Sequence, residues 1–182
     1  AILCYDNALS FNPEYALSLI NKGVALAELR KYEEAGACFD AVIRINPEYI
    51  EAWYNKGIAR AILGKTEEAV LCYDHVLSAD PGNAGAWGNK GLALVVLEKT
   101  EEAVLCFDQV IRINPDNADA WYNKGRALAR LKKFDEAVAC FDHVLRIDPK
   151  NEPALLSKGA ALTDLEEDED AIRCFDAVLQ IN

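Results

Sequence analysis

The sequence contains no methionine and only two histidines, and it has no long run of apolar residues. About the longest apolar run, Ala93–Leu97, is far shorter than the roughly 20 residues that a membrane-spanning helix needs, so we expect no membrane association. No basic segment followed by an apolar one marks a signal peptide at the start. Because the chain lacks methionine and begins at Ala1 within an apolar run, we expect it to be a piece of a longer protein.

Positive charge is also scarce. The 19 lysines and arginines face 30 aspartates and glutamates, which gives a formal net charge of −11. Nucleic acids are bound largely through Lys and Arg, so this balance argues against a nucleic-acid partner. The charge suits a basic or neutral partner, or it serves only solubility. With 52% hydrophobic and 27% charged residues, the composition is that of a folded globular protein rather than a disordered one.

Catalytic motifs are missing as well. The sequence has no Ser–His–Asp set, no glycine-rich phosphate loop and no HExxH segment. Acidic pairs occur at 33–34, 67–68, 101–102 and 135–136, where they suit the first turn of a helix better than a catalytic dyad. We therefore expect no enzymatic activity and no cofactor.

What the sequence does have is a strict period of 34 residues. Three residue types keep this step along the chain, which identifies duplicated units. The prolines that keep this step are Pro13, Pro47, Pro81, Pro115 and Pro149. The six cysteines are Cys4, Cys38, Cys72, Cys106, Cys140 and Cys174, and the aspartates that keep the step are Asp6, Asp40, Asp74, Asp108, Asp142 and Asp176.

Each unit is predicted to form two helices, such as Ala52–Leu63 and Glu67–Ala79, since apolar residues recur every three or four positions in both segments. Gly64 suits the C-terminus of the first helix, and Thr66 is predicted to cap the second. Pro81 ends the second helix, and Asn83 is predicted to cap the next one. No segment alternates with the period of two that a half-buried strand would show.

Trp53, Gly57, Ala69, Tyr73 and Pro81 match the tetratricopeptide pattern W-x2-L-G-x2-Y…A-x3-F…P at the right offsets, so the chain resembles the tetratricopeptide repeat (TPR) family. The resemblance implies an all-α fold, a right-handed superhelical α-solenoid of antiparallel helix hairpins in one domain. The predicted units are 1–15 (the second helix of a truncated repeat), 16–49, 50–83, 84–117, 118–151 and 152–182 (truncated at its last turn). Units 16–49 and 152–182 carry Leu19 and Leu155 in place of tryptophan.

One position departs from the family. Each glycine of the pattern follows a lysine, where the family has an apolar residue; the lysines are Lys22, Lys56, Lys90, Lys124 and Lys158. One interpretation is a buried stem with an ammonium that reaches water. The other follows from the antiparallel hairpin: if the glycine is level with the aromatic residue, the lysine is level with an aspartate. We predict a ladder of Lys–Asp pairs, such as Lys56 with Asp40 or Asp74.

The cysteines recur on equivalent helices, which pack about 8–10 Å apart, beyond the reach of a disulfide. We expect small, partly buried side chains in a reducing, cytoplasmic compartment. Cys72–His75 and Cys140–His143 have the i, i+3 spacing of two metal ligands, but further ligands are lacking nearby, so no metal site is predicted.

The resemblance implies that the first helices line a concave groove that binds a protein or peptide, extended or amphipathic. Its predicted contact residues are Ile20, Val24, Tyr54, Asn55, Ile58, Asn89, Leu92, Tyr122, Asn123, Arg126, Arg130 and Leu156. This groove would be apolar, with one basic spot on the fourth complete repeat. The lysines and asparagines of the family's clamp for chaperone C-termini are replaced, so chaperone tails are not predicted ligands. Alternatively, some of these residues simply pack between helices.

Three functional classes remain open from the sequence. The first is a protein-interaction scaffold. The second is a self-associating array, joined through its ends or through leucines on the second helices, Leu3, Leu71 and Leu105. The third is a regulatory module of a larger enzyme. A fold does not by itself give a function.

Overall fold

The computed structural model describes residues 2–12 and 15–181, so Ala1, Pro13 and Asn182 of the predicted repeats lie outside the described residues. The described residues form helices joined by short turns, and no strand occurs among them, which confirms the all-α prediction. The helices are α1 (Ile2–Phe11), α2 (Ala16–Glu28), α3 (Tyr32–Ile45), α4 (Ile50–Ile62), α5 (Thr66–Ala79), α6 (Ala84–Val96), α7 (Thr100–Ile113), α8 (Ala118–Arg130), α9 (Phe134–Ile147), α10 (Glu152–Asp164) and α11 (Asp168–Leu179).

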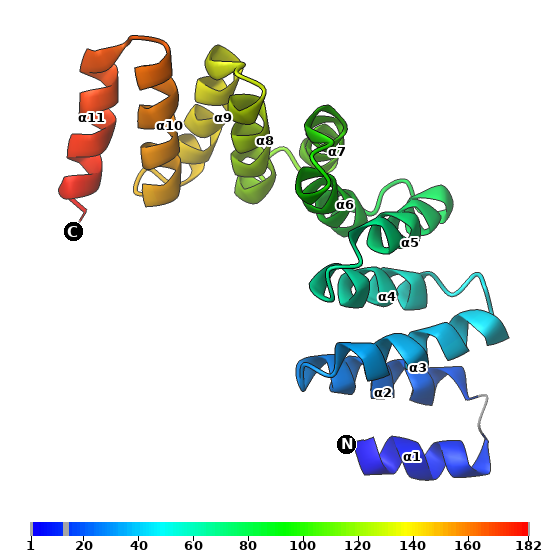
Figure 1. The fold of residues 1–182 in the computed structure, drawn as a ribbon. Coiled ribbons are helices and arrows are strands. Elements are labelled where there is room, and N and C mark those ends of the chain that lie inside the picture. The colour runs from blue at the N-terminus through cyan, green and yellow to red at the C-terminus, as the bar shows by residue number, and fades with distance from the viewer. Residues whose placement is uncertain (1, 13–14, 182) are drawn as a thin grey trace. The chain divides into compact units, whose positions relative to one another are not determined.

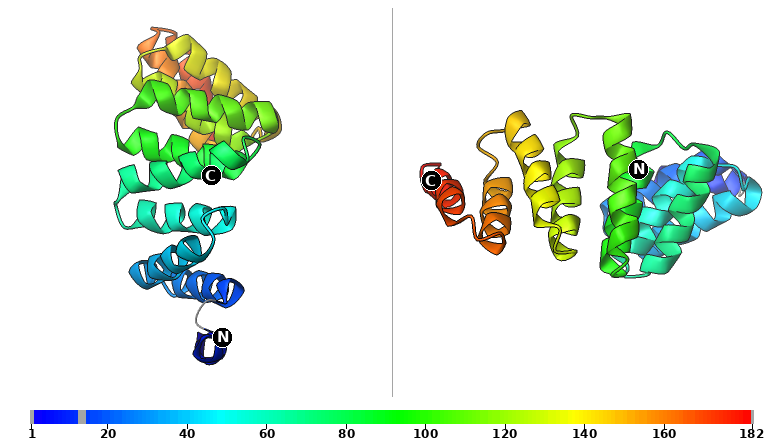
Figure 2. Two further views of the ribbon diagram at one scale, coloured as in Figure 1. Left: turned by 90° about the vertical axis from the view of Figure 1, so that its right-hand side faces the viewer. Right: turned by 90° about the horizontal axis from the view of Figure 1, so that it is seen from above.

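The chain divides into two compact units, residues 1–93 and 94–182. In the first unit, α2 pairs with α3 and α4 with α5, while α3 also packs on α4 (Figure 1). In the second unit, α8 pairs with α9 and α10 with α11, and α9 packs on α10 (Figure 2). Each hairpin therefore buries its second face against the next hairpin, as stacked helical repeats do. None of the described helices combines the length and apolar character needed to cross a membrane.

An asparagine caps three of the first helices, α6, α8 and α10, whereas a tyrosine without a side-chain cap precedes α2 and α4. The side chain of Asn83 accepts a hydrogen bond from the N–H of Ala86 at 2.9 Å, as predicted, and Asn117 and Asn151 do the same in the second unit. Helix α4 starts at Ile50, two residues before its predicted start, because the carbonyl of Tyr49 already accepts hydrogen bonds from the amides of Ala52 and Trp53.

The second helices begin without a side-chain cap, so the prediction for Thr66 is wrong. Thr66 is the first residue of α5 and is buried, while Lys65 occupies the cap position. The preceding turn explains this: Gly64 has φ +74°, and the N–H of Lys65 bonds to the carbonyl of Arg60 at 2.9 Å. This left-handed ending satisfies the last carbonyls of α4 and leads directly into α5. The first-turn carboxylates Glu67 and Glu68 then face the positive end of the helix dipole.

The mid-helix glycines make room for aromatic rings of the second helices, which are buried except for Phe175. An added Cβ would lie 2.6–2.7 Å from the ring of the second helix in four repeats, closer than van der Waals contact allows. The pairs are Gly23–Phe39, Gly57–Tyr73, Gly125–Phe141 and Gly159–Phe175. These contacts confirm that the rings occupy the space that the glycines leave open, so the helix-propensity cost of each glycine is offset by packing.

Five of the six cysteines are buried, as predicted, and all six are free thiols. Cys4 differs, since it is exposed on α1. Among the described helices, the backbone of α1 lies close only to that of α2, whereas Cys38, for example, belongs to a core cluster with Leu26 and Phe39. Burial raises the pKa of Cys38, Cys72, Cys140 and Cys174, and that of Cys140 reaches about 11.

Candidate binding surface

The predicted Lys–Asp ladder is present in all five positions. The ammonium of each repeat lysine lies 2.6 Å from a carboxylate oxygen of the preceding repeat. The pairs are Lys22–Asp6, Lys56–Asp40, Lys90–Asp74, Lys124–Asp108 and Lys158–Asp142. Of the two partners left open for Lys56, the structure therefore selects Asp40 rather than Asp74. The hydrogen bond to Asp6 raises the pKa of Lys22, and each pair links one hairpin to the one before it.

Tryptophan covers the lysine in three of these pairs. The ammonium of Lys56 lies 5.2 Å from the centre of the Trp53 ring, within the range of a cation–π contact. The equivalent contacts of Lys90 with Trp87 and Lys124 with Trp121 measure 5.4 and 5.5 Å. The indole N–H of each tryptophan donates to the carbonyl of the repeat proline before it. Ring and carboxylate together hold the ladder lysine, which gives it a structural role.

Arg60 adds a second link in one repeat. Its guanidinium lies 3.2 Å from Asp40 and 3.8 Å from Glu33 of α3, and 3.2 Å from Glu68 of α5. The approach of Nε to Glu68 forms an ion pair without hydrogen-bond geometry. The side chain of Arg60, which belongs to α4, therefore links α3 to α5.

In the first unit, the predicted contact residues meet at the α4–α6 junction. The amide of Asn89 donates to the hydroxyl of Tyr54 at 3.1 Å. Gly85 lies against this hydroxyl, where an added Cβ would come within 2.8 Å; the sequence analysis did not identify this glycine as part of the site. Leu92 is exposed beside them, whereas Asn55 is half-buried. The junction thus offers polar and apolar contacts side by side.

Three other residues of the first unit are less accessible than the predicted groove requires. Ile20 is 1% exposed and packs in a core cluster with Val42 and Ala52, so the structure removes it from the surface. Its branched side chain fills the space between α2, α3 and α4, in agreement with the alternative that some predicted residues pack between helices. Val24 and Ile58 are half-buried and keep part of their surface accessible.

In the second unit, the predicted residues lie on α8 and α10. The guanidinium of Arg126 lies 5.7 Å from the centre of the Tyr122 ring, and the tyrosine hydroxyl is 3.4 Å from the hydroxyl of Ser157. Ser157 was not predicted, since it stands where the other repeats have asparagine. Arg130 is exposed and donates to the carbonyl of Val95 at 3.5 Å. No ion pair of either arginine occurs among the residues that the structure describes.

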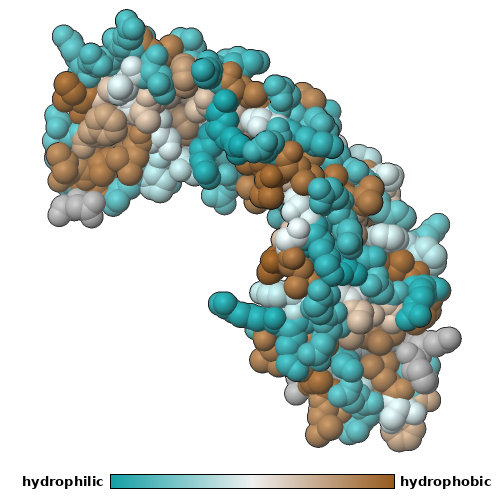
Figure 3. Space-filling model, in the orientation of Figure 1, coloured by the Kyte–Doolittle hydropathy of each residue, from teal (hydrophilic) through white to brown (hydrophobic). Residues whose placement is uncertain are grey.

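The remaining predicted positions of the second unit are Asn123 and Leu156. Asn123 donates its amide to the carbonyl of Asp119 at 2.9 Å within α8, and Leu156 is 47% exposed on α10. On the face shown in Figure 3, hydrophobic residues are interspersed with hydrophilic ones in both units. On this face, the hydrophobic residues therefore form several separate patches.

The two histidines pack on tryptophan rings. The ring centres of Trp121 and His143 are 3.9 Å apart in a parallel stack, and those of Trp53 and His75 are 4.2 Å apart. Burial lowers the pKa of His143. Within the described ranges, no group of three His, Cys, Asp or Glu side chains gathers as metal ligands would.

Stacked hairpins with this glycine–aromatic packing define an all-α helical-repeat protein, a class that presents extended surfaces to other macromolecules. The profile of the tetratricopeptide repeat family matches residues 1–50, 21–84 and 89–152. The chain belongs to the tetratricopeptide repeat family. No curated protein matches the sequence.

Solved structures of this family share the fold. YrrB, described as a TPR protein with an unusual peptide-binding site, is 25% identical, with a TM-score of 0.87 over 100% of this chain and 94% of that one. A crystal structure of MamA is 20% identical, with a TM-score of 0.88 over 93% of this chain and 92% of that one. MamA from Desulfovibrio magneticus RS-1 is 23% identical, with a TM-score of 0.87 over 91% and 94% of the two chains.

Proposed function

We propose that the chain is a protein-interaction scaffold that binds a peptide or protein segment on the accessible sides of its first helices. The observation that carries this proposal is the repeated pairing of a tyrosine on one first helix with a polar residue on the next. Tyr54 pairs with Asn89 in the first unit, and Tyr122 pairs with Ser157 in the second. Each pair places a ring and hydrogen-bonding groups at the junction of two helices.

Such a junction suits an extended or amphipathic segment. Asparagine amides both donate and accept hydrogen bonds, as a peptide backbone does, while Leu92 and Leu156 offer exposed apolar surface for side-chain anchors. Arg126 and Arg130 favour an acidic side chain at the second unit, because neither is neutralised by a described carboxylate. The peptide-binding description of YrrB, a relative by fold, supports the same class of partner.

A peptide library tests this proposal. Peptides selected on the wild-type chain are expected to bind the Tyr54→Ala/Tyr122→Ala variant at least about tenfold more weakly, since tyrosines are frequent binding hot spots. The control is Leu71→Ala/Leu105→Ala, which removes exposed side chains from second helices and leaves the first helices unchanged. Equal affinity of the selected peptides for the tyrosine variant and the wild type would contradict the proposal. Circular dichroism verifies that both variants remain helical.

Self-association is a second candidate, favoured by the exposure of three leucines on second helices. Leu3, Leu71 and Leu105 are 73%, 68% and 63% exposed. Apolar side chains exposed in this way occur at protein contacts. Light scattering across a concentration series separates the candidates: a rise in mass that Leu71→Asp/Leu105→Asp abolishes supports self-association, and a constant monomer mass rejects it.

A further inference from the structure

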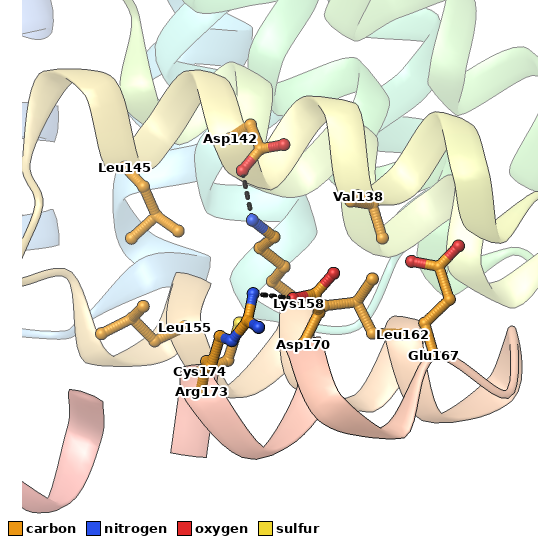
Figure 4. A pocket seen from close by; sticks show the side chains of 10 residues that line it. All are labelled: Val138, Asp142, Leu145, Leu155, Lys158, Leu162, Glu167, Asp170, Arg173 and Cys174. Atoms are coloured by element: carbon orange, nitrogen blue, oxygen red, sulfur yellow. Dashed lines mark hydrogen bonds and ion pairs between the residues drawn. The ribbon is translucent and has the colours of Figure 1, made fainter. Parts of the chain in front are cut away.

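A pocket of about 410 Å³ lies between α9, α10 and α11, away from the tyrosine junctions described above. Leu145, Leu155 and Leu162 form apolar walls, and the Lys158–Asp142 pair lies between them (Figure 4). The volume falls within the roughly 300–1,000 Å³ of ordinary ligand pockets. Among the further lining residues, Asp170 binds Arg173 at 2.6 Å, and Glu167 supplies another carboxylate.

The pocket coincides with a change in the repeat sequence. Leu155 stands 34 residues after Trp121, at the position where three other repeats carry an indole over the ladder lysine. Lys158 keeps its carboxylate partner but has leucine in place of that ring. The side chains of Lys22 and Lys158, in the two repeats with leucine, are 26% and 23% exposed, against 18–20% for the three lysines under tryptophan. The lysine side chain is thus slightly more exposed in the repeats that carry leucine than in those that carry an indole.

A second position in the pocket also holds a smaller side chain than the equivalent position of the repeat that contains Arg60. Between α3 and α5, Arg60 occupies this place, and its Cζ lies 4.0 Å from a Cβ added at Gly36. The equivalent residue between α9 and α11 is Leu162, which is shorter and uncharged. Trp53 and Arg60 therefore occupy the space between α3, α4 and α5, whereas Leu155 and Leu162 stand at the equivalent positions between α9, α10 and α11.

We infer that this pocket binds an aromatic side chain of a partner protein, with tryptophan preferred. The partner's ring takes the place of the missing indole: its face lies over the ammonium of Lys158 and its edges against Leu145 and Leu162. A ring in this place desolvates a lysine that stays paired with Asp142, which strengthens the cation–π attraction. Tryptophan has the most favourable ring for this contact, and Glu167 offers an acceptor for its N–H.

The site differs from the surface proposed for peptide binding. Its lining comes from α9, the side of α10 that faces it, the turn residue Glu167 and α11, and it includes Leu155 but not the adjacent Leu156. Leu155→Trp restores the residue of three other repeats and fills the pocket from within. Ile172→Trp is the control, because Ile172 is 57% exposed on α11 and belongs neither to the pocket lining nor to the proposed peptide-binding surface.

The experiment follows the amide and methyl NMR signals of the whole chain as N-acetyl-tryptophanamide is added. We expect shifts at residues around the pocket with a dissociation constant in roughly the millimolar range. N-acetyl-leucinamide, which has no ring, should bind at least about threefold more weakly, because it lacks the cation–π contact. Ile172→Trp should bind like the wild type, and Leu155→Trp should lose at least about tenfold in affinity while its helix content is unchanged.

A second variant keeps the test independent of how Leu155→Trp folds. Lys158→Gln/Asp142→Asn removes both charges with side chains of similar size, so the pocket remains but the cation is gone. Affinity for the tryptophan probe should fall about two- to fivefold, while that for the leucine probe stays the same. The inference is overturned if no shifts appear around the pocket, if both probes bind equally, or if a folded Leu155→Trp variant still binds the tryptophan probe.

Discussion

Alanine substitutions at two glycines of neighbouring helices, Gly57 and Gly36, should differ in their effect on stability. Both glycines lie inside a helix and are buried. A Cβ at Gly57 would come within 2.6 Å of the Tyr73 ring, whereas a Cβ at Gly36 would meet its nearest neighbour, Arg60, at 4.0 Å. The chemical change is identical at the two sites, so only the surrounding packing differs.

The expected magnitudes follow from two opposing effects. Alanine is the better helix former by about 1 kcal/mol, which should raise the free energy of unfolding for Gly36→Ala by about that amount. At Gly57 the same gain is offset by overpacking, which costs about 1–3 kcal/mol in a dense core. Tyr73 is 1% exposed, so its ring has no open space to move into. We expect Gly57→Ala to be less stable than Gly36→Ala by about 1–3 kcal/mol.

Urea unfolding followed by circular dichroism measures this difference, with the denaturant slope compared between variants to verify that the same surface unfolds. The double variant Gly57→Ala/Tyr73→Leu identifies the cause, because a smaller side chain relieves the clash and the two substitutions should then be non-additive. The reasoning is refuted if Gly57→Ala is as stable as Gly36→Ala, or if the Tyr73 substitution costs the same in both backgrounds.

Two further predictions concern the ladder and the thiols. A double-mutant cycle of Lys124→Met and Asp108→Asn should give a coupling free energy of about 1–2 kcal/mol, which is more than an exposed ion pair gives. The reason is that the two side chains form a close, partly buried, charge-assisted hydrogen bond. A coupling free energy near zero would contradict this prediction. At pH 8, a thiol reagent should modify Cys4 first, since it is exposed, while Cys140 reacts slowly because its pKa of about 11 leaves almost no thiolate; modification of Cys140 should accelerate as the pH rises toward 11, and mass spectrometry of digested samples distinguishes the two sites.

The 34-residue spacing predicted contacts between residues that recur at fixed positions of every repeat. The level placement of a glycine and an aromatic ring in a hairpin predicted a Lys–Asp ladder, and five pairs at 2.6 Å confirm it. The offsets did not distinguish Asp40 from Asp74 as the partner of Lys56. That choice depends on how one hairpin is placed on the next, which a period of 34 residues does not contain.

Burial, helix capping and pockets could not be predicted from the spacing, because they depend on how side chains pack in each repeat. Ile20 and Tyr54 occupy the same repeat position, yet Ile20 is buried between helices while the Tyr54 hydroxyl reaches Asn89 on the following first helix. The cap prediction for Thr66 failed because the left-handed turn at Gly64 leaves only Lys65 before the helix. The exchange of tryptophan for Leu155 was visible in the sequence, but the pocket beside it became apparent only from the packing of three helices.

The direction of the Lys–Asp ladder has a consequence for how the number of repeats changes. Each lysine binds the aspartate of the preceding repeat and not that of its own hairpin, so each of these junctions between repeats has the same two charges in the same order. Inserting or removing a whole number of 34-residue repeats recreates a matched junction, whereas a deletion of another size puts the lysine and the aspartate out of register. The number of repeats can therefore change without a new interface, while a misaligned junction separates a partly buried lysine from its carboxylate, which lowers stability.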